Sequence, residues 1–151
     1  MTPPAGATDA RVHALVDALS RSETPAFVEV PAELLRGPAL RTALKRGHWY
    51  VSTLDRAPVV DKTTLMHALY QSGEYPAGFG FNWDALLDVL RDLEWLESAR
   101  GIALIWRHPG VLEARSPDVA VTFREVVEDA CAHRAGRGYP PLRVLVPAEP
   151  R

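Results

Sequence analysis

Apolar residues recur with a helical period in some segments and gather in short β-prone runs in others. Near the start, Thr8 and Asp9 can cap a helix. Apolar residues follow at i, i+3, i+4 and i+7, at Val12, Leu15, Val16 and Leu19. The segment 25–30, PAFVEV, is β-prone and predicts a strand, and 37–47, GPALRTALKRG, predicts a helix with a proline at its start and a glycine past its end. The first third of the chain therefore predicts helix, strand, helix.

The same alternation continues to the C-terminus. Strands are predicted at 48–55 (HWYVSTLD), 101–108 (GIALIWRH) and 142–146 (LRVLV). Between them, helices are predicted at 61–73 (DKTTLMHALYQSG, with Gly73 as the stop), from Asn82 onward, and from about Pro117 to Ala135. Helices that alternate with short apolar strands predict an α/β layer with mostly parallel strands.

Composition indicates an ordinary globular chain. The 151 residues suit one domain, and 47% apolar with 24% charged residues is typical of a soluble protein. A formal charge of −2 gives no global reason to expect nucleic acid or a membrane as partner. The N-terminus lacks the basic and apolar regions of a secretory signal, and a single cysteine excludes an internal disulfide framework. We therefore expect a cytoplasmic protein.

No motif points to an enzyme, a cofactor or a metal. The histidines show no metal-ligand spacing with each other or with acids; they are His13, His48, His67, His108 and His133. Cys131 could act as a nucleophile only beside a base, and His133, two residues on, would point elsewhere on a helix. We interpret Cys131 as a buried structural thiol, and we expect no catalytic residue and no cofactor.

The stretch 78–97, GFGFNWDALLDVLRDLEWLE, concentrates negative charge on one side of a predicted helix. With Asn82 as N-cap and Trp83 as first helical residue, one side carries Asp84, Asp88, Arg91, Asp92 and Trp95, and the other carries Leu86, Val89, Leu90 and Leu93. The apolar side predicts core. The acidic side has two interpretations, a solvated surface and a binding surface for a basic protein.

The loop before this helix favours the second interpretation. The segment PAGFGFN sets two glycines and two phenylalanines beside an acidic helix start, an arrangement that suits a protein interface. Either Phe79 or Phe81 could instead simply fill the core, and the sequence leaves that alternative open. Catalysis by paired carboxylates is disfavoured, because acids at i and i+4 on one exposed face share one environment.

The run FGFNWDALLDVLRDLEW resembles the signature of the barstar family, small intracellular inhibitors of microbial ribonucleases. Further segments stand in the family's order: DKTTLMHAL upstream, LIWR at 104–107 and FRE at 123–125. The resemblance covers about residues 48–147. It implies a barstar-like domain at 48–151 with a small, mostly parallel sheet of three strands packed by helices. Residues 1–47 would form an α/β extension, expected to pack on the same domain.

The resemblance also implies a partner and a binding surface. The partner would be a basic ribonuclease whose active site is occluded by the acidic helix, as in an immunity protein or antitoxin. Asp88 would lie at the centre of the contact, and the implied partner-binding residues around it are Gly80, Asn82, Asp84, Leu87, Arg91 and Glu125. Such an inhibitor would be a monomer or weak homodimer without direct contact to nucleic acid or membrane.

Two features depart from the family's pattern. Leu87 stands in place of an aromatic, and Gly78 and Phe79 replace a pair of tyrosines. The charge of Arg91 would oppose a cationic partner unless Asp88 or Asp92 neutralises it. The alternative function is a non-inhibitory interaction or regulatory module on the same fold.

Overall fold

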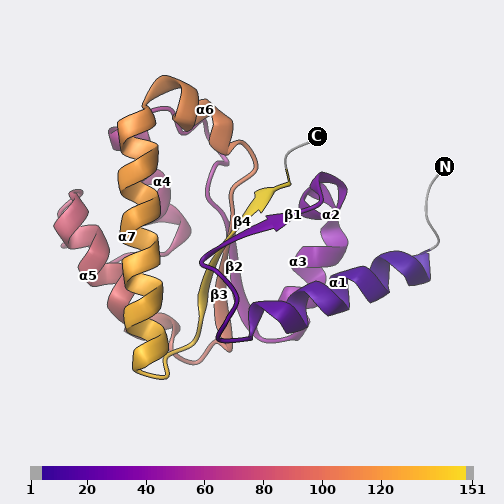
Figure 1. The fold of residues 1–151 in the computed structure, drawn as a ribbon. Coiled ribbons are helices and arrows are strands. Elements are labelled where there is room, and N and C mark those ends of the chain that lie inside the picture. Colours follow the sequence, from indigo (N-terminus) through magenta and orange to yellow (C-terminus); the bar gives the residue numbers. More distant parts are fainter. Residues whose placement is uncertain (1–4, 149–151) are drawn as a thin grey trace.

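The computed structural model describes residues 5–148, which build one parallel sheet between two helical layers (Figure 1). The strands are β1 (Phe27–Val30), β2 (Trp49–Thr53), β3 (Gly101–Ile105) and β4 (Leu142–Pro147), in the order β1-β4-β3-β2. Every neighbouring pair is parallel. The α/β class with parallel strands, predicted from the alternation of elements, is confirmed.

The expected number of three strands is wrong, because β1 joins the sheet as a fourth. It pairs with β4 from Phe27 opposite Val144 to Val30 opposite Pro147. The strand itself was predicted, at 25–30, but its place was not. Strand β4 is buried almost throughout. Without a neighbouring strand, its outer edge would leave backbone N–H and C=O groups unpaired, and β1 supplies the partners for them.

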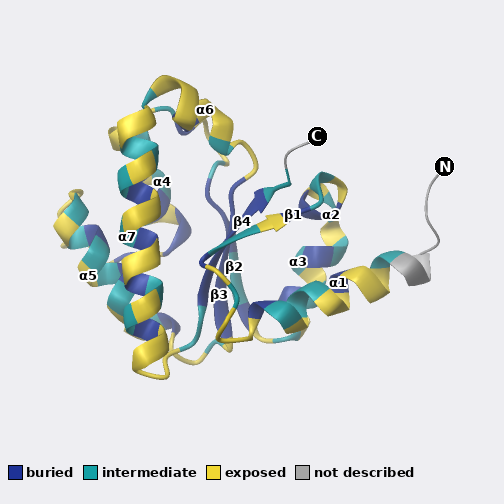
Figure 2. Ribbon diagram, viewed as in Figure 1, coloured by how far each residue is buried: buried dark blue, intermediate teal, exposed yellow. Residues whose placement is uncertain are grey.

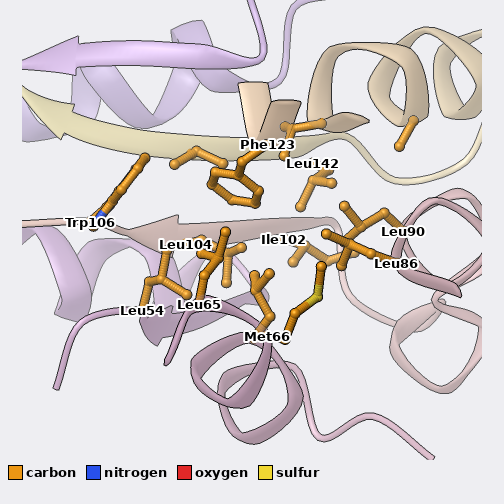
Figure 3. Packing of buried hydrophobic residues seen from close by; sticks show 14 of the residues in the cluster. Leu54, Leu65, Met66, Leu86, Leu90, Ile102, Leu104, Trp106, Phe123 and Leu142 are labelled. Atoms are coloured by element: carbon orange, nitrogen blue, oxygen red, sulfur yellow. The ribbon is translucent and has the colours of Figure 1, made fainter. Parts of the chain in front are cut away.

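One face of the sheet is covered by α4 (Lys62–Ser72), α5 (Trp83–Asp92), α6 (Pro109–Arg115) and α7 (Pro117–Gly136). Figure 3 shows how helices fill the core on this face of β3: Leu86 and Leu90 of α5 and Phe123 of α7 point toward Ile102. These side chains are almost completely buried. The apolar side predicted for the acidic helix is therefore confirmed as core, and burial orients its other side outward.

The opposite face is covered by α1 (Ala5–Leu19), α2 (Ala32–Arg36) and α3 (Pro38–Arg46). Side chains of β3 alternate between the two cores, with Ala103 and Ile105 on this second face, so β3 is buried from end to end, whereas the edge strand β1 is partly exposed in Figure 2. The buried Arg143 of β4 donates to the carbonyls of Leu19 and Arg21, at 3.1 and 3.0 Å. The N-terminal segment is thus bonded to the sheet at the end of α1.

Most predicted helix ends are confirmed, and the exceptions have local causes. Pro38 and Gly47 bound α3, and Asp61 caps α4 in a capping box with Thr64. Thr8 and Asp9 are not caps, because α1 already begins at Ala5. The short helices α2 and α6 were not predicted, since five and seven residues are too few to show a helical period.

Strands β2 and β3 are shorter than predicted because their continuations form a clamped pair of loops. The carboxylate of Asp55 accepts hydrogen bonds from the backbone N–H groups of Arg107 and His108, at 2.9 and 2.8 Å.

Within residues 5–148, no helix combines the length and the apolar character needed to cross a bilayer.

A buried arginine joins the two helices that form the acidic surface. Arg134 of α7 is 1% exposed and donates through Nη1 to the carbonyls of Leu90, Arg91 and Asp92, at 3.0 to 3.4 Å. It also donates to the carbonyl of Pro140 at 2.8 Å. The last carbonyls of a helix lack partners within the helix and carry partial negative charge, so a guanidinium is well suited to them. Arg134 therefore fixes the C-terminal end of α5 against α7.

Replacing this arginine should destabilise the whole fold. In Arg134→Leu, buried carbonyls of two segments lose their donor, and we expect the free energy of unfolding to fall by about 3 kcal/mol or more. Urea denaturation measures the change. The matched control is Arg137→Leu, which alters an exposed side chain beside the same helix end and should stay within about 0.5 kcal/mol of wild type. Equal effects of the two changes would contradict this role.

Cys131 is a half-buried thiol that packs between α7 and β4. Its Sγ donates to the carbonyl of Leu142 at 3.1 Å, and burial raises the pKa of the thiol from its ordinary value of 9.0 to about 11. A raised pKa keeps the thiol protonated and unreactive near neutral pH. The interpretation as a structural thiol therefore agrees with its surroundings.

This pKa predicts a specific loss of stability in alkali. Between pH 9 and 11 the folded thiol holds its proton while the unfolded one releases it, so the free energy of unfolding should fall by up to about 2 kcal/mol over this window. Cys131→Ala removes that contribution while leaving the other titrating groups in place. Denaturation of both proteins from pH 8 to 11 should show the wild type losing more stability, and parallel curves would refute the assignment.

Candidate functional site

The loop and cap before α5 are built by local hydrogen bonds. The Asn82 side chain accepts from the N–H of Ala85 at 2.8 Å and donates to the carbonyl of Gly80 at 3.2 Å. The predicted cap, with Trp83 as first helical residue, is confirmed. A Cβ on Gly80 would lie 3.0 Å from the Asn82 amide nitrogen and 3.4 Å from the Cβ of Ala85. Gly80 thus lets the loop approach the cap closely.

The acidic side of α5 faces outward. Asp84, Asp88 and Asp92 are exposed, whereas Leu87 is half-buried and packs against the edge of the core. The structure therefore brings together Asp84 and Asp88 on one outward side, with Leu87 at its margin. The position of Asp84 in the first turn also complements the positive end of the helix dipole.

The helix is shorter than the predicted wheel assumed. It ends at Asp92, because Leu93 takes a left-handed conformation (φ 45°, ψ 39°) and its N–H bonds back to the carbonyl of Val89. Trp95 therefore lies in the following 3₁₀ turn η1 (Glu94–Leu96), where it is half-buried and its indole N–H donates to the carbonyl of Gly73 at 2.9 Å. Placing Trp95 on the acidic side was wrong.

Arg91 turns toward the neighbouring helix. Its guanidinium lies 3.1 Å from the carboxylate of Asp129 on α7 and is half-buried between α5 and α7. Asp88 and Asp92, the two acids expected to neutralise it, form no ion pair with it in the described part of the chain. The charge that would oppose a cationic partner is therefore balanced by an acid that lies far away in sequence.

Glu125 extends the acidic surface onto α7. The contacts from Arg91 to Asp129 and from Arg134 to the end of α5 show that the two helices run in the same direction, as Figure 1 also shows. Glu125 is exposed one turn before Asp129, and Asp88 lies about one turn before Arg91. Both acids therefore lie at the same level of the helix pair.

The two phenylalanines of the loop have different surroundings. Phe79 is 8% exposed and packs in the core beside Tyr75, with ring centroids 5.0 Å apart. Phe81 is 37% exposed, and its ring rests on His67 and Tyr70 of α4, at 4.7 and 5.3 Å. The alternative left open by the sequence is resolved: Phe79 fills the core and Phe81 does not.

The electrostatics of α5 and α7 favour a cationic partner. The exposed acids on these two helices are Asp84, Asp88, Asp92, Asp118, Glu125, Glu128 and Asp129. Against them stand Arg91, paired with Asp129, and Arg124, whose guanidinium lies 4.1 Å from the ring centre of Phe27. No group of three acidic, histidine or cysteine side chains within the described residues could hold a metal ion. The two helices together present a negatively charged surface.

Sequence reasoning missed two residues that support this surface, Arg134 and His67, and only the first had a signal in the sequence. Arg134 continues the buried spacing of Phe123, Val127 and Ala130, so an arginine on an apolar stripe could have marked it as a buried cap. His67 had no such signal, because its contact with Phe81 depends on how the loop 76–82 folds back over α4.

Comparison with known proteins identifies the family. The family model described as Barstar (barnase inhibitor) matches residues 49–146, from the first residue of β2 to the penultimate residue of β4. No curated protein matches the chain significantly. The matched region contains the capped helix α5, the acidic residues and α7, and it leaves β1 and the helices of the second face outside. Since the match spans well over half of the sequence, the chain belongs to the barstar family of barnase inhibitors.

Proposed function

We propose that this chain inhibits a basic ribonuclease by covering its active site with α5. The observation that carries the proposal is the pair of exposed carboxylates, Asp84 and Asp88, on one outward side of a helix whose two ends are held. A ribonuclease binds a polyanion and must line its site with cations, so carboxylates presented at the right spacing can occupy the phosphate positions.

The proposed contact has a centre and a margin. Asp88 lies at the centre, Asp84 and Glu125 add negative charge beside it, and Gly80 and Asn82 shape the loop at the start of α5. Leu87 and Arg91 complete the margin, where Arg91 is already balanced by Asp129. The inhibitor needs no cofactor, because steric and electrostatic occlusion suffice.

The way α5 is held supports tight binding. The Asn82 cap orders its first turn and Arg134 orders its last, so little conformational freedom remains to be lost on association. An ordered acidic helix is preorganised for a fixed pattern of cations. In the cell such a protein would protect against a nuclease made by the cell itself or by a neighbour.

A non-inhibitory interaction module is the second candidate. The observation that favours it is the half-buried Leu87, which offers little apolar contact at the margin of the acidic residues. A module of this kind would bind a basic protein without blocking catalysis. Binding to a ribonuclease whose RNA cleavage continues would support this candidate and exclude inhibition.

Removing the central carboxylate should separate site-specific from diffuse charge effects. For Asp88→Ala we expect binding to the ribonuclease to weaken by more than about 2 kcal/mol, as for a central anchor, with the folding stability unchanged within about 0.5 kcal/mol. Strong charge coupling across an interface is a rule for which barnase and barstar are themselves the reference case. Calorimetric titration measures the affinity, with barnase as the first probe.

The matched control is Asp17→Ala, which removes an exposed acid from α1 on the opposite face of the sheet. It changes the net charge by the same amount and should leave affinity nearly unchanged. Equal weakening by the two variants would mean that only overall charge matters, and would contradict the proposed site.

A capture experiment identifies the natural partner. The immobilised wild type and Asp88→Ala are exposed to lysate and culture medium of the source cells, and retained basic proteins are assayed for RNA cleavage with and without added inhibitor. A ribonuclease held by the wild type, lost by the variant and silenced by the free chain is the expected result. A wild type that inhibits neither barnase nor any retained protein would refute the proposed function.

A further inference from the structure

We propose that Phe81 is the apolar anchor of the binding surface, placing its ring against an apolar hollow beside the cationic site of the partner ribonuclease. The inference rests on the proposed function and adds to the acidic surface a residue that charge alone would not reveal. Three observations meet at this side chain: its backbone conformation, the rings beneath it, and its position next to the acids of α5.

The backbone of Phe81 is strained. Its φ of 51° lies in the left-handed region, which glycine or asparagine adopts readily and a phenylalanine adopts at a cost. Packing of the ring on its neighbours offsets only part of this cost, since 37% of the residue stays exposed. If the loop only had to connect α4 and α5, a glycine at this position would serve it better. Strain of this kind at an exposed residue is typical of functional sites.

Three side chains form a fixed support for the ring. The centroid of Phe81 lies 4.7 Å from that of His67, 5.3 Å from Tyr70 and 4.9 Å from Phe79. Tyr70 is half-buried and Phe79 is buried, so the support is anchored in the core. A ring held in this way has few rotamers to lose on binding, which makes it a preorganised contact.

The ring also lies where an interface needs an anchor. Phe81 directly precedes the cap Asn82 and stands three residues before Asp84, so an apolar side chain borders the charged surface. Aromatic anchors surrounded by polar groups that exclude water dominate the energy of many interfaces. The other large exposed apolar side chains, Val111, Val121 and Tyr139, do not combine a left-handed backbone with a support of stacked rings.

Four variants separate the ring from the backbone. Phe81→Ala and Phe81→Gly both remove the ring, Phe81→Trp keeps an aromatic, and Val111→Ala truncates an exposed apolar side chain on α6. Binding to barnase, or to the ribonuclease retained by the wild type, is measured by titration of RNA cleavage. Thermal unfolding of each variant is measured in parallel.

Affinity for the ribonuclease should depend on the aromatic ring, and the unfolding temperature should depend on how well the residue tolerates the left-handed backbone. We expect Phe81→Ala and Phe81→Gly to weaken affinity on the order of thirtyfold or more, and Phe81→Trp and Val111→Ala to stay within about threefold of wild type. Since glycine tolerates the left-handed conformation, the Gly variant should unfold a few degrees (about 2–4 °C) above the Ala variant. The Gly variant therefore also shows that lost binding is not lost folding.

The outcomes distinguish this inference from the function on which it rests. If the wild type inhibits the ribonuclease and Asp88→Ala does not, but Phe81→Ala and Phe81→Gly bind within threefold of wild type, the anchor is overturned and the proposed function stands. If Val111→Ala weakens binding as much as Phe81→Ala, the anchor is likewise overturned. If the wild type inhibits no ribonuclease, both fall together.

Discussion

The buried guanidinium of Arg134 is the interaction on which the acidic surface depends. A helix end leaves carbonyls without partners, and here those of Leu90, Arg91 and Asp92 converge on one side chain of α7. The same side chain holds Pro140, the residue that leads into β4, through its carbonyl. One arginine thus joins the outward-facing helix to its neighbour and, through the following loop, to the sheet. The carboxylates of Asp84 and Asp88 can be presented in a fixed pattern because α5 is bonded at its far end.

The sheet supports this arrangement from below. The four parallel strands carry helices on both faces of the sheet, and β3 contributes alternate side chains to the two cores. The part of the chain outside the matched family region supplies β1 and the second helical layer. It closes the edge of β4 and is bonded to it through Arg143. The additional segment therefore stabilises the face away from α5 and leaves the acidic surface open.

On the open surface, charge and apolar contact are arranged side by side. The acids of α5 and α7 create a local negative potential on a chain whose net charge is only −2, and Asp129 balances Arg91. Phe81, in a strained conformation over His67 and Tyr70, supplies an apolar contact that the half-buried Leu87 does not. In the proposed complex, this strained loop would present the ring to the partner.

The sequence by itself determined those features that rest on local interactions. Periodicity placed the main helices and strands, the Asn82 cap was readable because its hydrogen bond spans three residues, and the acidic side of α5 followed from helix geometry. The motif around Asn82 also indicated the family. Tertiary structure alone decided the pairing of β1 with β4 and the ion pair of Arg91 with Asp129. It also decided that α5 ends at a left-handed Leu93, and that Phe79 is buried while Phe81 is partly exposed. Each of these depends on groups brought together from distant parts of the chain, and no local pattern encodes such contacts.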